Sequence, residues 1–251
     1  MCSLIILRRP EHPWPLLLGG NRDEMRDRAW LAPGRHWDDR PNVVAGLDRL
    51  AGGSWFGVND DGVVAVVMNR IGTLGPQASK RSRGELVLEA LDHAEAARAA
   101  EALADLDTRA YREFNLFVGD PVSAYWLRHA GADRVEVREV PAGLHMLTAS
   151  DLDDDGSARI RAYLPRFRRA VTPDPAAGDW NGWESLLASR DYAEQDGPHA
   201  ALNVDLPSGF GTVCSQLVAI PRYPRFEQRP IFRFAGGPPD RARFEAVPFD
   251  R

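Results

Sequence analysis

The order of strand-like and helix-like segments constrains the fold of this 251-residue chain more than any other feature of its sequence. Short apolar runs typical of strands fill the first third, return between 114 and 140, and return again between 213 and 234. Segments with helical spacing lie between them, at 86–94, 94–106, 158–167 and 183–189, with a loop expected at 171–178. Strands and helices that come in runs, rather than in strict alternation, are typical of α+β proteins. We therefore predict helices packed on antiparallel sheets.

Local patterns support this prediction. The apolar runs 54–58 and 63–68 flank an Asp61-Gly62 step, which is a strong signal for a β-hairpin. The second run is apolar at every position, which predicts a strand buried on both faces. Ser82 and Glu85 precede a further apolar run with the spacing of a capping box, so a helix is predicted to begin there.

The first two strands are predicted to form a hairpin near Cys2. Their apolar runs are 3–7 and 16–19, and a tight turn between them would bring the following polar residues back towards Cys2. Neighbouring residues of a strand point to opposite faces. Arg22 and Asp23 can therefore both serve Cys2 only if the second strand has ended before them.

Other segments are predicted to lie in loops or in the core. The segment 27–41 is rich in Arg, Trp and Pro and is predicted to be a loop, as is the segment that holds His145. Cys214 begins an apolar run and is predicted to be a buried strand residue, because free cysteine is commonly buried. The six histidines show no metal-ligand spacing, so we expect them to be surface or capping residues and expect no metal site.

Composition narrows the class of protein. The length suits one large domain or two small ones, and 44% hydrophobic with 27% charged residues is typical of a soluble protein. A net charge of −5 gives no reason to expect nucleic acid as a partner. The longest apolar run, 63–68, is too short to span a bilayer. Without a secretory signal pattern, and with two cysteines, we expect a reduced, cytoplasmic protein.

Cys2 is the first candidate for chemistry. It directly follows Met1, which is normally removed when the second residue is small. Removal would leave a thiol nucleophile on the same residue as a free α-amine with an unperturbed pKa near ~8. That pair is the minimal apparatus of an N-terminal-nucleophile hydrolase. The alternative is that Cys2 is a buried strand residue without a catalytic role.

Several motifs together resemble the Transport and Golgi organisation protein 2 family, which carries an Asn-Arg-Asp-Glu motif behind an N-terminal Met-Cys. The resemblance covers most of the chain and implies an N-terminal-nucleophile fold, a four-layer αββα sandwich, formed by residues 1–251 as a single domain. Within that fold the chain looks most like cysteine amidases such as bile-salt hydrolases and penicillin V acylases. The motifs are residues 21–24, 51–59, 68–70, 82–86, 114–120 and 211–215.

The resemblance also implies catalytic roles. Cys2 would be the nucleophile, Asp23 would bind or orient the α-amine, and Asn69 would donate to the developing oxyanion. The arginine expected three residues before the aspartate is Gly20 here, and Arg22 is the neighbouring cation that could replace it. A cation beside Cys2 would also lower the pKa of its thiol.

Further residues are predicted to bind the substrate: Asn21, Trp55, Arg70 and Asn203. The tryptophans near the proposed site either line an apolar pocket or pack in the core; they are Trp14, Trp30, Trp37 and Trp55.

Two functions remain open at the level of sequence. The first is an amidase or thioesterase that uses Cys2 after removal of Met1 and requires no cofactor. The second is a non-catalytic binding or trafficking protein for haem or an acyl lipid, in keeping with the links to haem trafficking and lipid homeostasis that the resemblance brings. In that case haem would be a ligand, held by the Cys2 thiolate. The expected partner is therefore a small amide, thioester, acyl lipid or haem.

Overall fold

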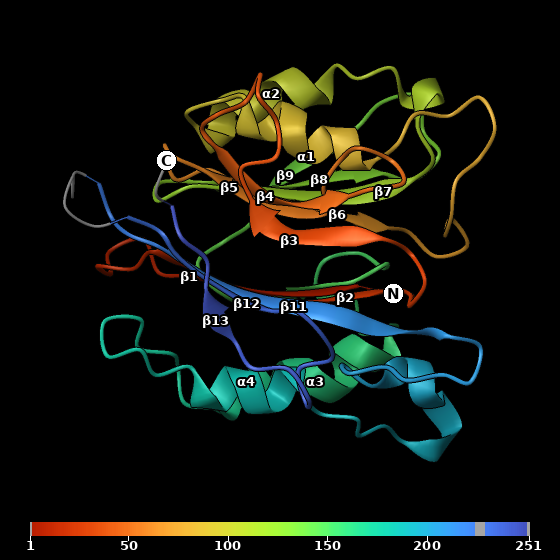
Figure 1. Cartoon of the computed structure of the whole chain (residues 1–251), viewed down its shortest axis with the longest axis vertical. Helices are drawn as coiled ribbons and strands as arrows, with labels where there is room; N and C mark the ends of the chain where they lie inside the picture. The colour runs from red at the N-terminus through yellow and green to blue at the C-terminus, as the bar shows by residue number, and fades with distance from the viewer. Residues whose placement is uncertain (1, 224–228, 250–251) are drawn as a thin grey trace.

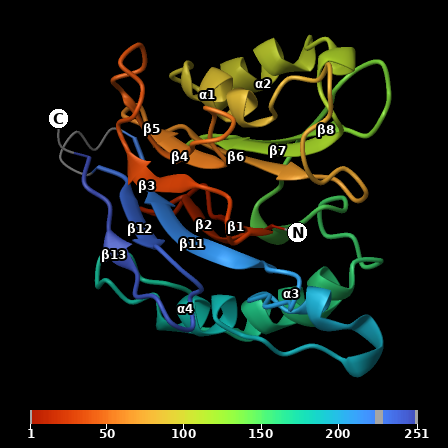
Figure 2. The ribbon, with the colours of Figure 1, turned by 45° about the vertical axis from the view of Figure 1, so that its right-hand side comes forward.

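Two antiparallel β-sheets face each other, and helices cover the outer face of each sheet (Figures 1 and 2). A computed structural model describes residues 2–223 and 229–249. Within these residues one sheet has six strands in the order β10-β1-β2-β11-β12-β13, and the other has seven in the order β3 to β9. Helices α1 and α2 cover the seven-stranded sheet, and α3 and α4 cover the six-stranded sheet. The layers form the αββα sandwich that the sequence predicted.

The elements have the following bounds. The six-stranded sheet contains β1 (Ser3–Arg8), β2 (Leu16–Met25), β10 (Gly143–Leu147), β11 (Phe210–Ile220), β12 (Ile231–Ala235) and β13 (Glu245–Ala246). The seven-stranded sheet contains β3 (Trp30–Gly34), β4 (Val43–Asp48), β5 (Phe56–Asn59), β6 (Val64–Asn69), β7 (Phe114–Gly119), β8 (Ala124–His129) and β9 (Glu136–Glu139). The α-helices are α1 (Gly84–Leu91), α2 (Ala96–Ala104), α3 (Ala158–Arg169) and α4 (Asn181–Leu187). The 3₁₀ helices are η1 (Thr108–Ala110), η2 (Glu194–Asp196) and η3 (Pro198–Ala200).

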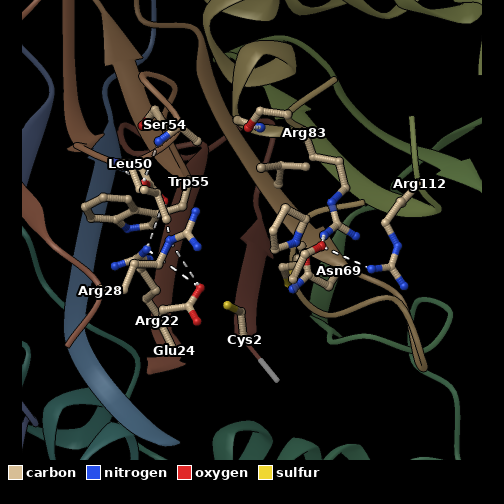
Figure 3. A pocket seen from close by; sticks show the side chains of 18 of the residues that line it. Cys2, Arg22, Glu24, Arg28, Leu50, Ser54, Trp55, Asn69, Arg83 and Arg112 are labelled. Carbon is tan, nitrogen blue, oxygen red and sulfur yellow. Dashed lines mark hydrogen bonds and ion pairs between the residues drawn. The ribbon is translucent and has the colours of Figure 1, made fainter. Parts of the chain in front are cut away.

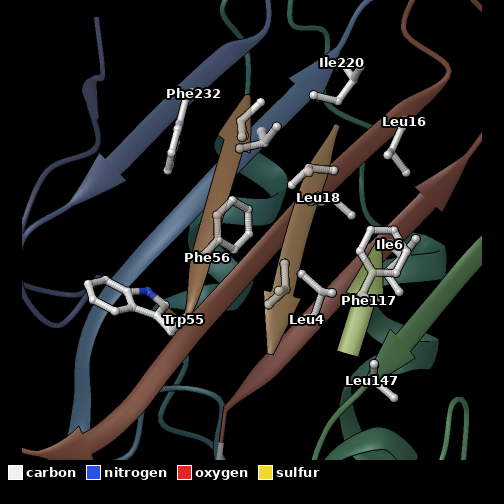
Figure 4. Close-up of a cluster of buried hydrophobic side chains, with 14 of the residues drawn as sticks. Leu4, Ile6, Leu16, Leu18, Trp55, Phe56, Phe117, Leu147, Ile220 and Phe232 are labelled. Carbon is white, nitrogen blue, oxygen red and sulfur yellow. The ribbon is translucent and has the colours of Figure 1, made fainter. Parts of the chain in front are cut away.

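The central strands are buried on both faces, which explains their unbroken apolar sequences. In β1, Leu4 and Ile6 pack between the two sheets, whereas Ile5 packs against α3 and α4 (Figure 4). The strand β6 behaves in the same way, with Val66 between the sheets and Ala65 under α1 and α2. The predicted burial of run 63–68 on both faces is confirmed. Burial of apolar surface in three layers is the main source of stability for such a sandwich.

The second strand is longer than its apolar run. β2 pairs with β11 along its whole length, from Leu16 opposite Ile220 to Met25 opposite Phe210. The strand therefore does not end before Arg22 and Asp23. Arg22 lies on the face that looks towards the seven-stranded sheet, and Asp23 lies on the face that looks towards α3.

Two predicted loops contain strands instead. The segment 27–41 holds β3, an edge strand that includes Pro33 and has no fully buried residue, so it lacks the apolar pattern of the inner strands. His145 lies in β10 opposite Ile6, with its Nδ1 atom 2.5 Å from the carboxylate of Asp153. The prediction of His145 on a loop was wrong because pairing with β1, which is distant in sequence, creates this strand.

Other local predictions need correction. His129 is buried and His145 is partly buried, so not every histidine lies at the surface. Helix α1 begins close to the predicted start, but its N-cap is Arg83 and no side chain caps it. Ser82 Oγ instead accepts a hydrogen bond of 3.2 Å from the Gly84 backbone, so the capping box does not form. Cys214 is fully buried in β11, as predicted.

Candidate active site

A cavity of about 450 Å³ lies where the beginning of β1 meets the ends of β2, β4 and β6 (Figure 3). The segment that leads into α1 forms another part of its lining. Its rim includes the exposed residues Leu50, Ala51 and Gln77, so the cavity opens to solvent. Polar and charged side chains share the lining with the apolar residues Leu50, Trp55, Val67 and Met68.

Cys2 lies in this cavity, directly before β1. Antiparallel pairing puts Ser3 opposite Asn21, so continuation of the same register brings Cys2 beside Arg22. The thiol donates to the backbone carbonyl of Asp23 over 3.8 Å. Burial raises the pKa of the Cys2 thiol, the Asp23 carboxylate raises it further, and the Arg22 guanidinium lowers it. A thiol in this environment needs a nearby base to become a nucleophile.

Arg22 is a buried cation fixed beside Cys2. Its guanidinium carbon lies 4.3 Å from the centroid of the Trp55 ring, and its Nη2 atom lies 3.3 Å from Asp48. Asp48 also accepts a 2.7 Å hydrogen bond from Arg28, while Glu24 completes this charged cluster. Only 5% of Arg22 is exposed, and its Nη1 atom has no hydrogen-bond partner among the described residues.

The Asp23 carboxylate is held by the helical layer. One of its oxygens accepts a 2.9 Å hydrogen bond from Arg159 of α3, and the other accepts a 2.7 Å hydrogen bond from Thr212 of β11. Both members of the ion pair are buried, with 3% of the Arg159 side chain and 0% of the Asp23 side chain exposed. The sequence analysis missed Arg159. The sequence pattern that could have indicated it is its position beside Ile160 and Tyr163, which define the buried face of α3.

Asn69 lies at the end of β6 and lines the same cavity. In Figure 3 it lies on the side of Cys2 away from Arg22. Its side-chain amide makes no hydrogen bond with the described residues, so both N–H donors remain available to a ligand. All four residues predicted as catalytic contribute to the lining: Cys2, Arg22, Asp23 and Asn69. Because β2 continues through Arg22 and Asp23, the Asp23 carboxylate is buried on the opposite face from Arg22, and Asp23 meets the Cys2 thiol through its backbone carbonyl.

The four predicted substrate-binding residues divide into two groups. Trp55 lines the cavity, whereas Asn21, Arg70 and Asn203 are absent from its lining. Asn21 faces the helical layer and donates to two backbone carbonyls, and Asn203 donates to another. Arg70 follows the end of β6 but pairs with Asp151 at 2.7 Å. These three positions tie elements of the fold together.

The structure also adds five cations that the sequence analysis did not single out for the site: Arg28, Lys80, Arg81, Arg83 and Arg112. Lys80, Arg83 and Arg112 line the cavity from the segment before α1 and from the segment before β7. Arg83 belongs to a motif used above only for the family resemblance and the start of a helix. Arg112 is distant in sequence from both, and only the tertiary fold brings it to the cavity.

Metal-binding clusters and membrane-spanning helices are both absent from the residues that the structure describes. Residues 2–223 and 229–249 contain no group of three or more His, Cys, Asp or Glu side chains that could hold a metal ion. No helix within these residues is long and apolar enough to cross a membrane.

Three solved structures resemble the fold of this chain. An N-acylethanolamine-hydrolyzing acid amidase orthologue from Caenorhabditis elegans has a TM-score of 0.55 and 13% identity, over 91% of this chain and 98% of that one. Penicillin V acylase from Agrobacterium tumefaciens has a TM-score of 0.51 and 13% identity, over 94% of this chain and 83% of that one. A mutant conjugated bile acid hydrolase from Clostridium perfringens has a TM-score of 0.53 and 11% identity, over 100% of this chain and 97% of that one.

These likenesses define the class of the protein by its fold. The chain has the fold of the N-terminal-nucleophile hydrolases, and at such low identity the comparison supports the fold alone. The model of the family Transport and Golgi organisation 2 matches residues 1–220, so the chain belongs to that family. None of the curated proteins compared with the chain matches it.

Proposed function

We propose that this protein is a cysteine hydrolase that cleaves a small amide or thioester, with Cys2 as its nucleophile after removal of Met1. The position of Cys2 carries the proposal. Its thiol lines an open cavity at the beginning of β1, beside the cation of Arg22 and across from the free amide of Asn69. The hydrolase-like fold and the likeness to three amide-cleaving enzymes support the same chemistry.

The proposed reaction begins with the thiol of Cys2. Its α-amine accepts the thiol proton while sulfur forms a bond to the carbonyl carbon of the substrate. The carbon–nitrogen or carbon–sulfur bond then breaks, and the α-ammonium returns the proton to the leaving group. A water molecule attacks the resulting thioester in the second half of the reaction, which releases the acid and restores the thiol.

Asn69 and Asp23 serve different parts of this reaction. The Asn69 amide donates to the oxyanion that forms during attack, an interaction typically worth about 3 kcal/mol when the donor is preorganised. Asp23 lies next to Arg22 along β2, where the paired register brings the start of β1 alongside. Arg159 and Thr212 hold its carboxylate, which in turn orients the α-amine of the processed chain.

Separate substitution of the two cysteines distinguishes a catalytic role of Cys2 from a structural one. We expect Cys2→Ala to abolish turnover of a panel of small amides and acyl thioesters while retaining the circular dichroism spectrum. The matched control is Cys214→Ala, because this second and last cysteine is fully buried. It should remain active. Unchanged turnover in the Cys2→Ala variant would end the proposal.

Haem or acyl-lipid binding is the alternative, and the same cavity would have to serve it. Cys2 is the only thiol or imidazole in the described lining, and burial raises the pKa of its thiol. That shift disfavours the thiolate that would ligate haem iron. A Soret shift that requires Cys2 would nevertheless favour haem. No spectral change with haem and no thermal stabilisation by acyl-CoA would count against the alternative.

A further inference from the structure

The charged side chains of the cavity fall into two groups that differ in how they are paired. On one side of Cys2, Arg22 and Arg28 share the carboxylates of Glu24 and Asp48. Arg81, also in the lining, pairs with Glu85 and Glu89. The three remaining cations of the lining are called the cationic wall: Lys80, Arg83 and Arg112. Figure 3 shows Arg83 and Arg112 on the same side of Cys2 as Asn69. Among residues 2–223 and 229–249, no carboxylate lies within ion-pair distance of the cationic wall.

Arg83 is held in place by neutral acceptors alone. Its Nη1 atom donates to the hydroxyl of Thr73 at 2.9 Å and to the carbonyl of Glu113 at 3.0 Å. Burial and the neighbouring Arg112 together lower the pKa of Arg83 to about 10, although Glu113 and Glu24 act in the opposite direction. A partly buried charge without a counter-ion is costly. An anion bound in the cavity would offset that cost.

Arg112 is fixed just as firmly. Its guanidinium donates to three carbonyls of the segment 72–75, those of Gly72, Leu74 and Gly75, over 3.0 to 3.2 Å. Lys80 donates to the carbonyl of Arg109 at 2.6 Å. These contacts position the cations without neutralising them, so little side-chain freedom is lost when an anion binds.

Arg22 provides an independent observation on the other side of Cys2. Its side chain is nine-tenths buried or more, yet the Nη1 atom has no partner among the described residues. Buried donors are normally satisfied in folded proteins, and an unsatisfied one at a cavity points to a missing acceptor. The cavity thus offers an unsatisfied donor of Arg22 on one side of the thiol and, on the other, cations that are hydrogen-bonded only to neutral oxygens.

We propose that the cationic wall binds an oxyanion, a carboxylate or a phosphate group, that belongs to the substrate. The planar guanidinium groups of Arg83 and Arg112 suit the paired oxygens of such groups. The proposed function identifies the bound molecule as a substrate, whereas the anion site rests on the cavity itself. The substrate class is therefore an anionic amide or thioester whose charged group lies on the Asn69 side of the reacting carbonyl.

Binding of small anions tests the site without any need for turnover. Thermal unfolding of the full chain is measured in phosphate-free buffer with glycerol 3-phosphate or glutarate, and with the neutral analogues glycerol and glutaramide. We expect the anions alone to raise the melting temperature. The anion that binds more tightly by titration calorimetry identifies phosphate or carboxylate as the preferred group. Equal effects of the charged and neutral compounds on the wild-type protein would overturn the proposal.

Variants of Arg112 connect the effect to the cationic wall. We expect Arg112→Gln to weaken binding of the preferred anion by about tenfold or more, from the typical strength of a charged hydrogen bond. Arg112→Lys keeps the charge and should retain more of the affinity. The control is Arg98→Gln on α2, because Arg98 is exposed and pairs only with Glu101 at the surface. Unaltered binding in a folded Arg112→Gln variant would contradict the site, as would equal losses in the Gln and Lys variants.

The test separates this inference from the proposed function. Anion binding that depends on Arg112 stands even if no amide or thioester is hydrolysed. If turnover is found, the anionic member of a matched substrate pair should have the lower KM. Arg112→Gln should then raise that KM and reduce the preference for the anionic substrate over the neutral one. Equal KM values for the two substrates of the wild-type enzyme would contradict the proposal.

Discussion

The guanidinium of Arg22 stacks on the indole of Trp55, with 4.3 Å between the guanidinium carbon and the ring centroid. Gly46 permits this arrangement, because a Cβ atom at that position would collide with the indole. Asp48 anchors the same guanidinium from its edge at 3.3 Å. A rigid cation is thereby placed on the cavity face of β2, where it opposes the effect of burial on the Cys2 thiol.

The first prediction concerns this cation. Arg22→Gln should raise the pKa of the Cys2 thiol further, because a nearby positive charge favours the thiolate. The rate of iodoacetamide labelling of Cys2 as a function of pH measures the shift by mass spectrometry. The midpoint should move to higher pH in Arg22→Gln and stay in place in Arg98→Gln. An unmoved midpoint in Arg22→Gln would show that the cation does not act on the thiol.

The second prediction concerns the buried pair of Asp23 and Arg159. Arg159→Met should reduce the free energy of unfolding by about 3–5 kcal/mol, because it removes the guanidinium that pairs with a fully buried carboxylate. Urea denaturation measures the loss. Removal of both charges in Asp23→Asn with Arg159→Met should recover part of it. A single variant as stable as the wild type would contradict the structural role given to Arg159.

The third prediction explains the glycine that replaces the expected arginine. A Cβ atom on Gly20 would lie 2.7 Å from the Ser3 carbonyl of the neighbouring strand, so no larger side chain fits without a backbone shift. Gly20→Ala should cost about 1–3 kcal/mol, the range typical of overpacking. Gly236→Ala is the control, because the nearest atom to its added Cβ would be 3.7 Å away. Equal stability of the two variants would refute this account of Gly20.

The fourth prediction uses pH to test the ion pairs that Asp151 forms with Arg70 and Arg128. Burial alone would raise the pKa of Asp151, but hydrogen bonds from Arg70 and Arg128 outweigh it and hold that pKa below its usual value. The stabilisation is therefore fully present above the unfolded-state pKa of about 3.9 and is lost as pH falls through the lower, folded-state pKa. Asp151→Asn should lower the melting temperature at pH 7, and the difference should shrink in acid. A difference that is constant with pH would contradict the assignment, and the exposed Asp38→Asn serves as control.

The apolar layers could be predicted from the sequence because the central strands are buried on both faces and read as unbroken apolar runs. The end of β2 could not, since residues 21–24 are polar and extend the strand only by pairing with β11. The same reason applies to β10, whose partner β1 is distant in sequence. The edge strand β3 was not predicted, because a strand at the edge of a sheet with no buried residue has no apolar pattern in its sequence.

The candidate site divides along similar lines. Cys2, Arg22, Asp23 and Asn69 belong to motifs that are visible in the sequence, and all four line the cavity. Asn21 and Arg70 belong to the same motifs, but strand alternation and tertiary pairing direct their side chains elsewhere. Arg83 and Arg112 act together only because the fold joins the beginning of α1 to the segment before β7. Single-sequence patterns contain no information about such a contact.

Intact-mass spectrometry of the purified chain after brief exposure to an acyl thioester tests the central claim most directly, with the N-terminal peptide then sequenced. The account predicts that Met1 is absent and that the acyl group is attached to Cys2. A chain that retains Met1, or an acyl group found on another residue with Cys2 unmodified, would contradict an N-terminal cysteine nucleophile.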